Sequence, residues 1–113
     1  MEARLASSVL ATALIRRAEA EGGFAAVLAK GDSTAGAILV ILAQRGENPR
    51  FLERVLQSDG DYSWQEIGRE AAVNQEAGEK FLARRRKSDP DLWIIELDVP
   101  SAERFAAEMN ATV

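Results

Sequence analysis

Residues 37–43 constrain the fold more than any other segment, because all seven residues are apolar. A strand with one face in water would alternate apolar and polar side chains. This run does not alternate, so we predict a central strand that is buried on both faces. A chain of 113 residues can enclose such a strand, since about two-thirds of its unfolded surface becomes buried on folding. We therefore expect a single domain over residues 1–113.

Turn-forming residues separate this strand from the other predicted elements. Gly22-Gly23 ends a first helix, because glycine accepts the left-handed conformation at a helix C-terminus. Asp89-Pro90 ends a later helix, because the residue before proline is driven out of the α region. The predicted helices cover residues 6–21, 74–88 and a last segment after Pro100-Ser101. The predicted strands cover residues 24–30, 37–43, 51–56, 92–99 and a segment that begins at Tyr62.

The order of these elements favours the α+β class. Residues 24–30 and 37–43 are expected to form a hairpin through the turn at residues 31–36, and short turns between strands imply antiparallel pairing. Residues 62–68 also fit a helix, because Ser63 and Glu66 have the spacing of a capping box, although we favour a strand. We predict a two-layer α+β domain of order α-β-β-β-β-α-β-α, with a mostly antiparallel sheet of about five strands and its helices on one face.

Apolar periodicity identifies the side chains that these elements bury. In the three helices they are Leu10, Ala11, Leu14, Ile15 and Ala18, with Val9 as a second buried edge; Ala77, Gly78, Phe81 and Leu82; and Ala102, Phe105, Ala106 and Met109. In the strand 92–99, Trp93, Ile95, Leu97 and Val99 share one face, and Leu92, Ile94, Glu96 and Asp98 share the other. Tyr62, Trp64 and Trp93 are expected in the core rather than on a ligand-stacking surface.

The chain contains neither cysteine nor histidine, and this excludes several kinds of site. It cannot form a disulfide, a cysteine or histidine catalytic centre, or a conventional zinc site. We accordingly assign no catalytic residue, no metal site and no cofactor. No stretch approaches ~20 apolar residues, so we expect no membrane span and a cytoplasmic protein. The net charge of −4 disfavours nucleic acid and anionic membranes, unless a local cationic patch forms.

Four consecutive cations at residues 84–87 precede the turn at Asp89-Pro90 and form the main candidate binding site. Cations here would bind an anion, and they would also be stabilised by the negative end of the helix dipole. Helical spacing places Arg85 near Phe81, on the apolar side. We therefore expect Arg85 to be at least half buried and to touch a carboxylate. The candidate partners of Arg85 are Asp89, Asp91 and Glu96.

Arg84, Arg86 and Lys87 then remain for an acidic or anionic partner. Arg16 and Arg17, near the end of the first helix, repeat the pattern and are further candidates. The two basic helix ends would combine into one patch if they met on one face of the sheet, which the sequence leaves open.

Two other segments have partial motif spacing. Residues 31–36 contain glycines, serine and threonine, but they match neither a nucleophile elbow nor a phosphate-binding loop. Asp91, Glu96 and Asp98 resemble the acidic half of a metal-dependent nuclease, yet Asp98 stands where that pattern has lysine. Asp91 and Glu96 are also five residues apart on a strand and should face opposite ways. Neither segment is assigned a catalytic role.

The leading functional hypothesis is a non-enzymatic binding or interaction module that recognises an acidic or anionic partner. The first alternative is a protein that contacts nucleic acid through a local basic patch, with salt-sensitive affinity. A further alternative is an enzyme that uses carboxylates alone, which requires two acids converging in a pocket. A homodimer through a sheet edge or an apolar patch is compatible with the sequence, which has no heptad pattern.

Residues 13–17, 22–37 and 82–93 together resemble an uncharacterised family of short bacterial proteins, known only as a domain of unknown function. The run Arg84-Arg85-Arg86 followed by Asp89-Pro90-Asp91-Leu92-Trp93 is the most specific part of the resemblance. The resemblance spans most of the chain, with residues 44–77 contributing little. It implies a small, single-domain, cytoplasmic bacterial protein and implies no activity.

Overall fold

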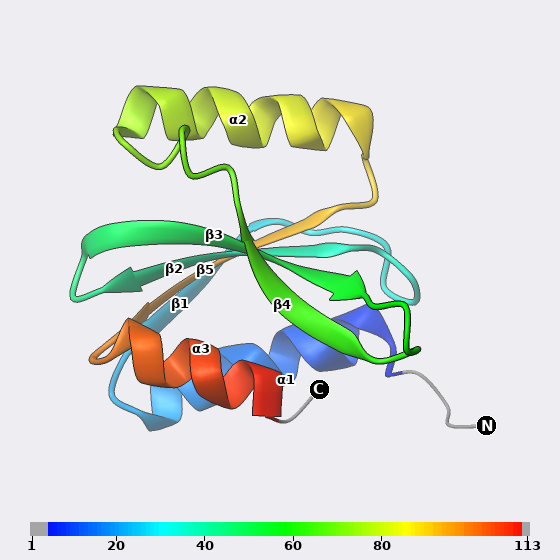
Figure 1. Ribbon diagram of the computed structural model, residues 1–113, viewed down its shortest axis with the longest axis horizontal. Coiled ribbons are helices and arrows are strands. Elements are labelled where there is room, and N and C mark those ends of the chain that lie inside the picture. Colours follow the sequence, from blue (N-terminus) through cyan, green and yellow to red (C-terminus); the bar gives the residue numbers. More distant parts are fainter. Residues whose placement is uncertain (1–4, 112–113) are drawn as a thin grey trace.

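The apolar run forms β2, Ile38–Gln44, which is the middle strand of a five-stranded sheet in the order β1-β5-β2-β3-β4. The computed structural model describes residues 5–111 (Figure 1). Its helices are α1 (Ser7–Ala20), α2 (Gln75–Ser88) and α3 (Ala102–Ala111). Its other strands are β1 (Phe24–Ala29), β3 (Glu47–Leu56), β4 (Tyr62–Ile67) and β5 (Trp93–Val99).

The predicted fold class and order of elements are confirmed. Every residue of β2 from Ile38 to Ala43 is buried, as expected for a strand covered on both faces. Residues 62–67 form a strand, as favoured, and not the helix that the capping-box spacing also allowed. The predicted faces of β5 are also confirmed, because Trp93, Ile95, Leu97 and Val99 lie in one apolar cluster and Leu92 and Ile94 lie in another.

The expected hairpin between residues 24–30 and 37–43 is wrong, because β5 lies between β1 and β2. β5 pairs antiparallel with β1 and parallel with β2, so that Ile95 stands beside Val27 on one side and Val40 on the other. The apolar side chains on both faces of β5 explain this position, since a central strand must be buried above and below. β5, which comes late in the sequence, therefore lies between two strands that the local turn residues predicted to pair with each other.

Residues 31–36 form a loop that crosses the start of β5 instead of a hairpin turn. The amide of Asp32 donates to the carbonyl of Asp91 at 3.0 Å, and the indole Nε1 of Trp93 donates to the carbonyl of Asp32 at 2.7 Å. The hydroxyl of Ser7 donates to the carbonyl of Gly36 at 2.6 Å, which fastens the beginning of α1 to the same loop. A Cβ atom added at Gly36 would meet the backbone carbonyl of Asp91. The crossing loop therefore requires glycine for close backbone approach.

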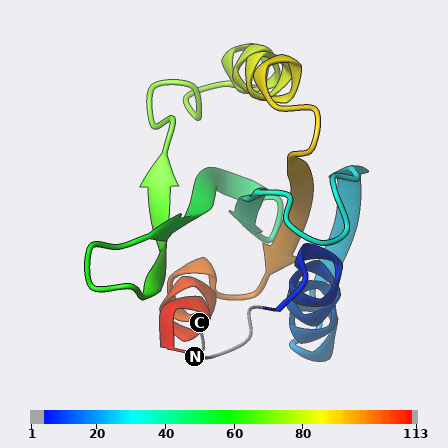
Figure 2. The same cartoon turned by 90° about the vertical axis from the view of Figure 1, so that its right-hand side faces the viewer.

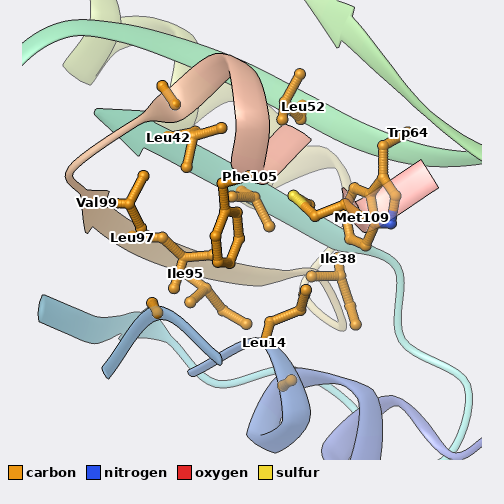
Figure 3. Packing of buried hydrophobic residues seen from close by; sticks show 14 of the residues in the cluster. Leu14, Ile38, Leu42, Leu52, Trp64, Ile95, Leu97, Val99, Phe105 and Met109 are labelled. Carbon is orange, nitrogen blue, oxygen red and sulfur yellow. The ribbon is translucent and has the colours of Figure 1, made fainter. Parts of the chain in front are cut away.

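The helices cover both faces of the sheet, which corrects the prediction that they all lie on one face. Figure 1 shows α2 above the sheet and α1 and α3 below it, and Figure 2 shows the same separation from the side. The larger core lies on the α1 and α3 side. Phe105 and Met109 of α3 and Leu14 of α1 meet Ile95 and Leu97 of β5 there (Figure 3). The predicted apolar stripes of α1 and α3 are confirmed, except that Val9 is exposed.

The α2 face has a smaller core. Leu39, Ile41, Phe51 and Ile94 form the sheet side of this core, and Leu92 and Ala71, which lie outside the strands, complete it. Phe81 of α2 stacks on Phe51 with ring centroids 5.0 Å apart, and Leu82 packs beside it. Gly78 is the only buried residue of α2, so this helix is attached through fewer buried side chains than α1 or α3.

The crossing loop gives a test of this topology. Gly36→Ala should lower the free energy of unfolding by about 2 kcal/mol, because the new methyl group meets backbone atoms of Asp91 and Asp32 that cannot turn away. Ser33→Ala, in the same loop, should change it by less than ~0.5 kcal/mol, since Ser33 is exposed. Urea denaturation of both variants measures the difference, and equal stabilities would contradict the close packing of the loop on β5.

Candidate functional site

The C-terminal end of α2 carries the cations that the sequence singles out. Asn74 caps the N-terminus of this helix, because its Oδ1 accepts from the amide of Ala77 at 2.8 Å. It ends before Asp89, which is extended and precedes Pro90. The last turn holds Arg85, Arg86 and Lys87, where the helix dipole favours positive charge.

Arg85 forms an ion pair with a carboxylate that the sequence did not suggest. Its Nη2 lies 2.8 Å from Oε1 of Glu53 on β3, and the two side chains are 29% and 22% exposed. The expected partners are placed elsewhere: Asp89 Oδ1 accepts from the amide of Asp91, and Glu96 lies on β5 opposite Ile41. The partner is therefore corrected to Glu53. It lies 32 positions away in the chain, and only the packing of α2 over β3 brings it near.

Arg86 bonds to backbone carbonyl groups. Its Nη1 donates to the carbonyl oxygen of Leu92 at 3.0 Å, and its Nη2 donates to that of Lys30 at 3.3 Å. The side chain thus connects the end of α2 with the beginning of β5 and the end of β1. Within residues 5–111 no carboxylate lies within ion-pair distance of this guanidinium, so its charge is not neutralised by a direct partner.

Arg84 and Lys87 are exposed, and neither forms an ion pair in the described part of the chain. Lys30 is exposed, and its backbone carbonyl accepts from Arg86, so this residue from a distant part of the chain brings a further cation to the same region, which sequence reasoning missed. Asp32 and Asp89 lie at the same end, and their carboxylates accept hydrogen bonds from backbone amides. The end of α2 thus presents exposed cations with acidic residues around them.

The other basic pair, Arg16 and Arg17, lies on the opposite side of the sheet, so the two basic helix ends do not meet (Figure 1). Arg17 binds Oε2 of Glu108 at 2.8 Å and lies over the ring of Phe105. Hydrogen bonds from Arg104 and then from Arg17 lower the pKa of Glu108. Arg17 therefore joins α1 to α3, while Arg16 is exposed.

The carboxylates within residues 5–111 do not gather into a metal site. Among residues 5–111 no group of three acidic side chains is close enough together to hold a metal ion. Glu96 and Asp98 share a face of β5, but Asp98 Oδ1 accepts from the amide of Gly46 at 2.9 Å. Trp64 and Trp93 are buried, and Tyr62 lies under Arg54 with the guanidinium carbon 4.0 Å from the ring centroid.

The Arg85–Glu53 pair can be separated from the exposed cations by mutation. Arg85→Ala should lower the free energy of unfolding by about 2 kcal/mol, because it leaves the Glu53 charge largely buried without its partner. Arg84→Ala is the matched control and should cost less than ~0.5 kcal/mol. Thermal or urea unfolding of both variants measures this. A double-mutant cycle with Glu53→Ala should give a coupling of about 1 kcal/mol, and additive losses would place Arg85 at the surface.

Comparison with known proteins places this chain in one family. The model of the protein family of unknown function DUF1491 matches residues 5–107. The crystal structure of a DUF1491 family protein from Caulobacter crescentus CB15 is 33% identical, with a TM-score of 0.80, over 90% of this chain and 94% of that chain. The NMR structure of a DUF1491 family protein from the same organism is 31% identical, with a TM-score of 0.77, over 93% and 94%.

The solution structure of Atu0922 from A. tumefaciens is 33% identical, with a TM-score of 0.74, over 92% of this chain and 93% of that chain. The comparison with curated proteins found no match. The matched span includes the crossing loop, the cations of α2 and the whole of β5. This chain therefore belongs to the DUF1491 family of proteins of unknown function.

Proposed function

We propose that this protein is a non-enzymatic binding module that recognises an acidic partner through Arg84, Arg86 and Lys87. The proposal rests on the hydrogen bonds of the Arg86 guanidinium and on its missing ion pair in the described part of the chain. Two backbone carbonyls hold its guanidinium in place, and no carboxylate within residues 5–111 forms an ion pair with it. A guanidinium positioned in this way can bind a carboxylate without first losing the entropy of its side chain.

The neighbouring residues support this assignment. Arg84 and Lys87 are exposed on the same end of α2 and add two charges. Arg85 serves a different role, since Glu53 neutralises it. Asp32, Asp89 and Asp91 lie around the cations and weaken their field. We therefore expect modest affinity that falls with salt, as for exposed charges in general.

Nucleic acid is the less favoured partner. The chain has a net charge of −4, and its two groups of consecutive arginines lie on opposite faces of the sheet. An extended phosphate backbone needs a continuous basic surface. The carboxylate-only enzyme is also less favoured: Glu79, Glu96 and Asp98 line one cleft, but Asp98 accepts a hydrogen bond from the amide of Gly46, and no group of three acids within residues 5–111 is close enough together to hold a metal ion.

We further propose that the protein acts in the bacterial cytoplasm. The relatives from C. crescentus and A. tumefaciens support a bacterial origin. The lack of cysteine is compatible with a reducing compartment. Of the helices within residues 5–111, none has the length and apolar character that crossing a membrane requires.

A labelled poly-glutamate peptide is a direct probe of the basic end of α2. Arg84→Gln, Arg86→Gln and Lys87→Gln together should weaken its binding about tenfold, equivalent to ~1.4 kcal/mol, since three favourable charges are removed. The double variant Arg84→Gln, Lys87→Gln keeps the bonds of Arg86 and should lose part of this affinity. Fluorescence anisotropy at low salt measures both, with thermal unfolding to show that each variant is folded.

The matched control is the triple variant Arg16→Gln, Arg45→Gln, Arg69→Gln, which changes the net charge equally with exposed residues outside α2. It should weaken binding less than about twofold, because the Debye length screens distant charges. Equal losses from the two triple variants would contradict the site. Tighter, steeply salt-dependent binding of a single-stranded oligonucleotide would favour the nucleic-acid alternative.

A further inference from the structure

β1 is an edge strand with little of the usual protection of such strands. Its sequence, FAAVLA, contains no charged residue and no proline. Phe24, Leu28 and Val27 are 75%, 53% and 45% exposed. Natural edge strands generally carry charges, proline or bulges that prevent pairing with another chain. β1 has one irregularity, between Val27 and Ala29, so most of its outer edge offers backbone groups to a further strand.

A cleft of about 460 Å³ opens beside β1, between α2 and the sheet. Leu28, Ile41 and Leu82 contribute apolar surface to it. Glu79, Glu96 and Asp98 contribute carboxylates, and no lysine or arginine is among the residues that line it. An occupant of this cleft should therefore combine apolar side chains with a positive charge.

The register of the sheet shows how a strand on β1 could reach these carboxylates. Ala26 stands opposite Glu96, and Phe24 stands opposite Asp98. Neighbouring strands lie about 4.8 Å apart, so a strand added to β1 would lie roughly 10 Å from β5. The small side chain of Ala26 leaves space for a lysine or arginine to extend over β1 toward Glu96. An apolar residue two places from that cation would lie beside Phe24, and one on its other side would lie near Leu28, which lines the cleft at the irregularity before Ala29.

We propose that β1 binds an extended peptide segment as a sixth strand, with a lysine or arginine directed over Ala26 to Glu96 and apolar residues on either side of it. This mode gives affinity through main-chain hydrogen bonds and selectivity through alternate side chains. A second copy of the protein fits less well. Its own β1 carries no cation to meet Glu96, and two chains of net charge −4 repel each other. The site is independent of the acidic-partner site on α2.

The test uses two seven-residue probe peptides, Thr-Val-Thr-Lys-Thr-Val-Thr and the same peptide with glutamate in place of lysine. In the ¹⁵N-labelled full chain, the lysine peptide should shift the amide signals of residues 24–29. It should bind about fivefold more tightly than the glutamate peptide, since an attraction to Glu96 replaces a repulsion. Glu96→Gln should reduce this preference to less than about twofold.

Glu47→Gln is the matched control, because Glu47 is exposed on β3 and does not line the cleft. It should leave the preference unchanged. Unshifted β1 amides would overturn the proposal, and so would equal binding of the two peptides by the wild-type chain. Concentration-dependent β1 shifts without peptide, with a dimer in sedimentation, would assign the edge to a second copy instead. Loss of poly-glutamate binding in the α2 variants has no bearing on these results.

Discussion

The parallel pairing of β2 and β5 is the interaction on which the rest of the structure depends. β2 is apolar on both faces, and β5 is apolar along one face and at the beginning of the other, so each needs cover above and below. Parallel neighbours also require a crossover connection, which here consists of β3, β4 and α2. This connection places α2 on one face of the sheet, and α1 and α3 cover the other. β1 is left at the edge because β5 takes the place beside β2.

The two faces are covered unequally, and this difference determines where binding surfaces occur. α1 and α3 bury Leu14, Phe105 and Met109 against the sheet. α2 buries Gly78 and relies on the partly buried Phe81 and Leu82, together with the Arg85–Glu53 pair. A helix attached in this way keeps most of its charges in water. It also leaves a cleft between itself and the β1 side of the sheet. Both proposed sites lie on this lightly covered face.

Local patterns predicted the elements well, and the pairing of distant elements poorly. Neighbouring residues determine the glycine and proline turns, the apolar stripes and the alternation of β5. These features could therefore be predicted from the sequence. The position of β5 depends on competition between strands, and residues 31–36 look like a hairpin turn when the late strand is ignored. The site follows the same division. Helical spacing indicated that Arg85 faces the sheet. Only the strand order brings Glu53 next to Arg85 and Lys30 next to Arg86.

Native-state hydrogen exchange tests most directly whether α2 is the weakly attached layer. Amides of β2 and β5 should exchange only through global unfolding, because these strands lie buried at the centre of the sheet. Amides in the middle of α2 should exchange through a smaller opening, with a free energy at least ~1 kcal/mol lower. Amides of α1 and α3 should follow the sheet. Protection of α2 equal to that of β5 would contradict the account, because α2 would then be as firmly packed as the core.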